Sequence, residues 1–168
     1  METPAADPLP RIADILWPNS ESEQSLRARL GGLTGVDPAR AAWELFALRD
    51  HALDVMYSLI YDGRNVPPDM TTSIFKVLEP RWATAPAPAN VEEWRASRDA
   101  LYTGVMPGGE DARPYPEIWK DWIERVGGCF ASAFDAPENG AGQIGTLEYD
   151  KAAKQLFPLC KQLPDRWR

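Results

Sequence analysis

The stretch that decides the fold is residues 43–63, WELFALRDHALDVMYSLIYDG. An α-helix turns about 100° per residue, so apolar residues with helical spacing gather on one side of it. In this stretch they form one broad arc: Leu45, Leu48, Ala52, Leu53, Val55, Met56, Leu59 and Ile60. Asp37 and Pro38 are typical of a helix start, and Gly63 is typical of a helix end. The sequence therefore predicts a long helix from Pro38 to Gly63.

Further helices are predicted on both sides of this one, because proline and glycine bound the other apolar runs. Short helices are expected over residues 10–17, 20–30, 66–80 and 91–102, and longer ones over 116–134 and 147–163. The expected N-caps are Ser20 or Ser22 for the helix over 20–30 and Asn90 for the helix over 91–102. The apolar face of residues 116–134 keeps its phase across Gly127 and Gly128, which favours one continuous helix there. Thr146 is the expected N-cap of the last helix, whose apolar face continues through Pro158.

The expected fold is all-α, because nowhere do four or more residues alternate in a run rich in β-branched side chains. We expect a single compact domain of about six helices over residues 10–168, with two long helices at its centre. Residues 1–9 are expected to form a flexible N-terminal arm.

Charge and composition exclude several classes of function. The 168 residues include 18 basic and 25 acidic side chains, a net charge of −7, which argues against nucleic-acid binding. No apolar run approaches the roughly 20 residues of a membrane span, and residues 1–12 do not resemble a signal peptide. A cytoplasmic protein is expected, in which Cys129 and Cys160 are reduced thiols.

The sequence disfavours a dinucleotide site, a metal site and a Cys–His nucleophile. Residues 140–145, GAGQIG, match the glycine spacing of a dinucleotide site, but no strand precedes them. A metal site in a helical bundle usually needs several histidines, and His51 is the only one, so no metal and no cofactor are predicted. The acids Glu117, Asp121 and Glu124 share a polar helix face that solvent and helical charge pairs explain. A Cys–His nucleophile is disfavoured because both cysteines lie on apolar faces.

Arg49 falls inside the apolar arc of the helix over residues 38–63. An arginine in such a position either pairs with a buried carboxylate or lines a pocket that grips an anionic ligand. His51 lies about 130° from the centre of the arc, so it is expected to be an exposed surface residue.

A stripe of acids and aromatics lies beside the arc: Trp43, Asp50, Asp54, Tyr57 and Tyr61. Tryptophan and tyrosine are common at interfaces, and two interleaved acids suit a partner that offers lysine or arginine. The alternative is that another helix of the same domain covers the stripe.

Two hypotheses of function follow. The first is a non-catalytic binding protein, such as an inhibitor, an immunity or antitoxin-like protein or an accessory subunit, which docks a basic protein partner through the stripe. The second is a helical protein or enzyme with an internal pocket, in which Arg49 anchors a small anionic molecule.

Overall fold

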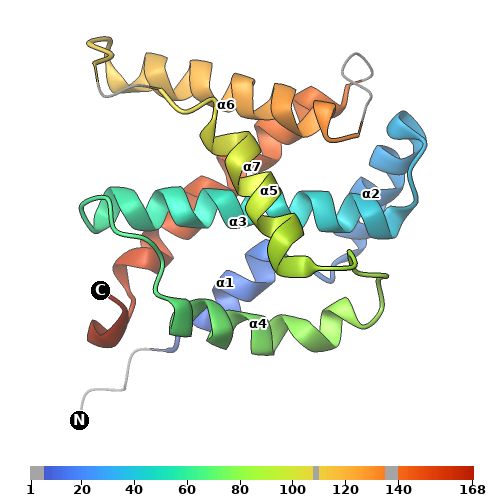
Figure 1. Ribbon diagram of the computed structural model, residues 1–168, viewed down its shortest axis with the longest axis horizontal. Helices are drawn as coiled ribbons and strands as arrows, with labels where there is room; N and C mark the ends of the chain where they lie inside the picture. Colours follow the sequence, from blue (N-terminus) through green and yellow to red (C-terminus); the bar gives the residue numbers. More distant parts are fainter. Residues whose placement is uncertain (1–5, 108–109, 135–139) are drawn as a thin grey trace.

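The fold is all-α, as predicted. The computed structural model describes residues 6–107, 110–134 and 140–168, and these contain helices and no strand. The elements are α1 (Leu9–Leu16), α2 (Glu21–Thr34), α3 (Pro38–Ile60), α4 (Pro68–Trp82), α5 (Val91–Thr103), α6 (Tyr115–Ser132), α7 (Ala141–Lys161) and a 3-10 helix (Asp165–Trp167) (Figure 1). None of the helices in the described ranges is both long enough and apolar enough to cross a bilayer.

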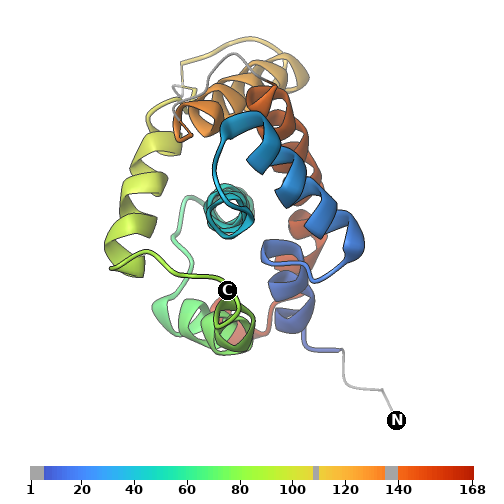
Figure 2. The same cartoon turned by 90° about the vertical axis from the view of Figure 1, so that its right-hand side faces the viewer.

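The longest helix, α3, lies at the centre of the molecule. Figure 2 looks along α3 and shows the other α-helices arranged around it. Every residue from 41 to 53 is buried, so other parts of the chain surround this part of α3. The long helices α6 and α7 pack against each other, and α7 also packs along α3.

The helix starts agree with the capping signals in the sequence. Three predicted N-cap side chains each accept a hydrogen bond from the backbone N–H three residues further on, at 2.9 to 3.2 Å: Ser20 from Glu23, Asp37 from Arg40, and Asn90 from Glu93. These bonds satisfy backbone donors that have no partner inside the helix. At the N-terminus, residues 1–5 lie outside the described ranges, and α1 already begins at Leu9, which is buried.

Aromatic rings fill the core between α3 and the helices α1, α4 and α5. The rings of Trp17, Trp43 and Trp82 contact one another with centroids 5.0 to 6.5 Å apart. Phe46 and Phe75 extend this cluster. Trp17 and Trp43 are therefore core residues on this side of α3, and the half-buried Trp82 packs against them.

The packing of α6 against α7 depends on glycine. A Cβ atom at Gly127 would collide with Thr146 and with the backbone of Gly142, and one at Gly145 would lie 2.7 to 2.9 Å from atoms of Phe130. The continuous helix predicted across Gly127 is confirmed. The glycine-rich stretch over 140–145 thus forms part of a contact between helices.

The predicted start of the last helix was wrong. Helix α7 begins at Ala141, and its N-cap is Gly140, which has a φ of 91°. Thr146 lies inside the helix, where its single hydroxyl proton is shared between the carbonyls of Gly142, at 3.0 Å, and of Ile123 on α6, at 3.1 Å. The threonine that resembles a cap therefore connects the two helices instead.

We predict that Gly127→Ala destabilises the protein by about 1–3 kcal/mol, because the added methyl group forces α6 and α7 apart. Gly128→Ala is the matched control, since a Cβ there meets nothing within 4 Å and alanine favours the helix by roughly 1 kcal/mol. Urea unfolding of both variants measures the difference. Equal stabilities would contradict the close contact.

Candidate functional site

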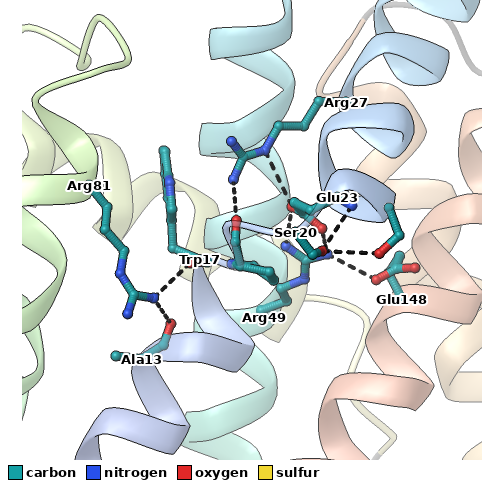
Figure 3. A network of polar contacts seen from close by, with 10 residues as sticks. Ala13, Trp17, Ser20, Glu23, Arg27, Arg49, Arg81 and Glu148 are labelled. Atoms are coloured by element: carbon teal, nitrogen blue, oxygen red, sulfur yellow. Dashed lines mark hydrogen bonds and ion pairs between the residues drawn. The ribbon is translucent and has the colours of Figure 1, made fainter.

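Arg49 lies in a buried ion-pair network between α2, α3 and α7. Its guanidinium donates two hydrogen bonds to the carboxylate of Glu23, at 2.7 and 2.9 Å, and a third to Glu148, at 3.0 Å (Figure 3). The side chains of Arg49 and Glu23 are each only 4% exposed. Arg27 donates a further hydrogen bond to Glu23 and one to the carbonyl of Pro18. The network joins three helices through one arginine.

The geometry of this network is that of a structural ion pair. Burial lowers the pKa of Arg49, but the hydrogen bonds and charges of Glu23 and Glu148 outweigh it, so the pKa is raised. A groove of about 460 Å³ reaches these three residues, and it is also lined by Arg29 and Lys151. An anionic ligand that reached Arg49 there would have to displace Glu148.

The prediction that His51 is exposed was wrong. The imidazole is 3% exposed, with Nδ1 at 3.0 Å from the hydroxyl of Tyr149 and Nε2 at 3.4 Å from that of Thr103. The error arose because the polar side of α3 faces α5 and α7 rather than solvent. Burial lowers the pKa of His51 to about 4, so the ring is neutral at pH 7.

The aromatic residues of the predicted stripe lie inside the domain. Trp43 belongs to the aromatic core, Tyr57 donates a hydrogen bond to the carbonyl of Trp167, and Tyr61 donates one to that of Cys160. All three are buried, which corresponds to the alternative that other parts of the chain cover the stripe. The two acids of the stripe, in contrast, both reach a cavity.

This cavity is a cleft of about 960 Å³ bounded by α3, α4, α5 and α6. It is hereafter called the acidic cleft, because its lining carries four carboxylates and, among the described residues, one guanidinium: Asp50, Asp54, Glu92, Asp99 and Arg95. Three apolar side chains that line it are largely exposed: Leu59 at 51%, Met106 at 41% and Tyr115 at 57%. The cleft thus combines an excess of negative charge with apolar surface open to solvent.

Within the cleft, Asp50 is paired with Arg95. The guanidinium donates two hydrogen bonds to the carboxylate, at 2.5 and 3.1 Å, and lies 5.0 Å from the centre of the Phe75 ring. Asp54 and Asp99 have no hydrogen bond or ion pair to any described part of the chain. Burial and the charge of Asp50 raise the pKa of Asp54 to about 8. A carboxyl so perturbed beside a cleft is a mark of functional sites.

The titratable groups that line the cleft are carboxyl groups, the imidazole of His51, the guanidinium of Arg95 and the phenol of Tyr115, and not thiols. Neither cysteine lines it, and burial raises the pKa of both thiols, that of Cys160 to about 12. No group of three or more histidine, cysteine or acidic side chains among the described residues is arranged to hold a metal ion. The carboxylates that remain can neutralise an organic cation.

Sequence reasoning missed Leu59, Arg95 and Asp99. Leu59 was expected in the core because it lies on the apolar arc of α3, yet it faces the cleft. Arg95 and Asp99 are four residues apart on α5, which is typical of an ordinary surface pair. In the structure Arg95 pairs across helices with Asp50, so no local signal could have indicated the site.

Comparison with known proteins places the chain in no family: no family model matches it, and no curated protein or solved structure is significantly similar to it.

We predict that Arg49→Met destabilises the protein by about 3–5 kcal/mol, because it leaves Glu23 buried without its main partner. The double variant Glu23→Leu with Arg49→Met should be more stable than the single variant, since the unpaired carboxylate is gone. Thermal unfolding compares the two. A single variant as stable as the native chain would instead favour Arg49 as a ligand anchor.

We also predict that His51 does not titrate between pH 5.5 and 8, because burial holds its pKa near 4. As the only histidine of the chain, it gives a single imidazole Hε1 signal in proton NMR. The signal of the native chain should keep its position over this range, whereas that of the urea-unfolded chain should move with a midpoint near 6.5. A native midpoint near 6.5 would mean that the imidazole is solvated.

Proposed function

We propose that this chain is a non-catalytic binding protein that docks a positively charged segment of a protein partner in the acidic cleft. The observation that supports this most directly is the pair of carboxylates, Asp54 and Asp99, that line the cleft without a cation of their own. The docking surface differs from the predicted stripe, because it keeps Asp50 and Asp54 but takes its aromatic residues from α4 and α6.

Two physical contributions would act together in such a complex. The exposed side chains of Leu59, Met106 and Tyr115 offer apolar area, whose burial stabilises a complex by roughly 25 cal/mol per Å². The carboxylates attract a basic segment over about 10 Å at moderate salt and disfavour acidic ones. The exposed apolar side chains and the carboxylates of the cleft would together select a partner segment that is both basic and partly apolar.

The alternative function is binding of a small anion in the groove beside Arg49. Arg29 and Lys151 line this groove and would add positive charge to it. It has weaker support, because the guanidinium of Arg49 already donates to Glu23 and Glu148.

Binding in the acidic cleft can be tested with a defined basic peptide of 12 residues, in which lysine and arginine alternate with leucine and serine. In a ¹H–¹⁵N NMR titration at low salt, we predict that the largest shifts fall on α3, α5 and α6 residues that line the cleft. The variant Asp54→Asn with Asp99→Asn should bind the peptide about tenfold more weakly, a change of about 1.4 kcal/mol.

The matched control is Glu79→Gln with Glu124→Gln. Compared at pH 8.5, where Asp54 is mostly charged, it removes nearly the same charge from two exposed helical positions, on α4 and α6, that do not line the cleft. This control should bind as the native chain does. Equal weakening in both double variants would mean that net charge alone attracts the peptide and would contradict a site in the cleft.

A further inference from the structure

One carboxylate of the acidic cleft, that of Asp50, is already paired with a cation of the chain, the guanidinium of Arg95. The planar guanidinium of Arg95 donates two parallel hydrogen bonds to the single carboxylate of Asp50 and lies over the ring of Phe75. A forked pair of this kind is the arrangement that an arginine side chain prefers. A second guanidinium entering the cleft would find this carboxylate occupied.

The carboxylates left over come from two different helices. Asp54 lies on α3 and Asp99 on α5, and the charge of Asp99 acts on Asp54. Two separate carboxylates suit a compact ammonium group, whose three N–H donors radiate from one atom. Together with the absence of a metal-binding group in the described residues, this points to an alkylammonium ion.

The wall that α6 contributes suits an apolar stem. Tyr115, Ile118 and Trp122 line the cleft at positions i, i+3 and i+7, which places them on one face of α6. Trp122 is 6% exposed, and its indole N–H is buried with no hydrogen-bond partner within the described chain. The three side chains thus give the cleft an apolar wall along α6.

We infer that the acidic cleft selects a lysine side chain of the partner, with its ammonium group between Asp54 and Asp99 and its four-carbon stem along the α6 wall. This inference rests on the proposed function, since it names the residue that the basic segment inserts. It distinguishes lysine from arginine, which the proposed function alone does not.

The protonation state of Asp54 should make the binding of a lysine side chain depend on pH. The groups that act on Asp54 or line the same cleft are Asp50, His51, Glu92, Arg95, Asp99, Tyr115, Tyr149 and Cys160. Because the carboxyl of Asp54 has a pKa of about 8, it is mostly neutral at pH 6.5 and mostly charged at pH 8.5. An ammonium ion favours the charged form, so its binding should strengthen as the pH rises through 8. Lysine itself stays protonated until about pH 10.

Three capped heptapeptides test the inference. They share the sequence Gly-Ser-Leu-X-Leu-Ser-Gly, in which X is lysine, arginine or norleucine. On the native chain at pH 8.5, the lysine peptide should bind at least about tenfold more tightly than the arginine peptide, a difference of about 1.4 kcal/mol, and the norleucine peptide weakest. The lysine affinity should rise on the order of tenfold from pH 6.5 to 8.5, and this rise should be absent in Asp54→Asn.

Each contrary outcome has a distinct meaning. Equal or tighter binding of the arginine peptide would overturn the lysine inference but leave the cleft as a site for cations. Failure of both basic peptides to shift cleft residues would contradict the proposed function itself. Binding of n-butylamine as tight as that of the lysine peptide would overturn the assignment to a protein side chain. Persistence of the lysine preference in Asp54→Asn with Asp99→Asn would overturn the role of these two carboxylates, provided that the variant keeps its native melting temperature.

Discussion

The arrangement of helices depends on forked arginine–carboxylate pairs that connect α3 to its neighbours. Arg49 of α3 binds Glu23 of α2, while Glu44 and Asp50 of α3 bind arginines of α5, each with two hydrogen bonds. A buried pair of this kind adds little net stability, but the loss of either partner is costly. Because a two-bond pair fits only one rotation of the helix about its axis, these pairs determine which sides of α3 face α2 and α5.

The pairing of arginines with carboxylates of α3 also shapes the acidic cleft. Asp50 and Asp54 lie one helical turn apart on α3, yet only Asp50 is matched by an arginine. The pair between Asp50 and Arg95 holds α5 in place across the cleft. Asp54 beside it has no hydrogen bond to a cation, and burial and the charge of Asp50 raise its pKa more than the charge of Arg95 lowers it. The ion pair of Asp50 with Arg95 thus lies beside the carboxyl of Asp54, which has no hydrogen bond within the described chain. The helix arrangement that forms the pair leaves the carboxyl of Asp54 lining the cleft.

The sequence predicted the helices well and the surroundings of α3 poorly. Caps such as Ser20, Asp37 and Asn90 are local signals, and each acts as expected. The helical periodicity of the apolar residues also placed Arg49 inward correctly. It assigned His51 to solvent because such a pattern implies that one side of the helix is polar and exposed. The cleft could not be predicted, because pairs such as Arg95 with Asp50 join residues 45 positions apart. No spacing rule within a single helix contains that information.

The central place of α3 also has a consequence for how the chain is made. Several groups that cover this helix come from α7 or beyond, with separations of 98 to 110 residues: Tyr149 against His51, Glu148 against Arg49, and Trp167 against Tyr57. At a synthesis rate of about 5–20 residues per second, α3 waits roughly 5–20 s for this cover. During translation it is therefore an apolar segment whose charges have not yet met all of their partners.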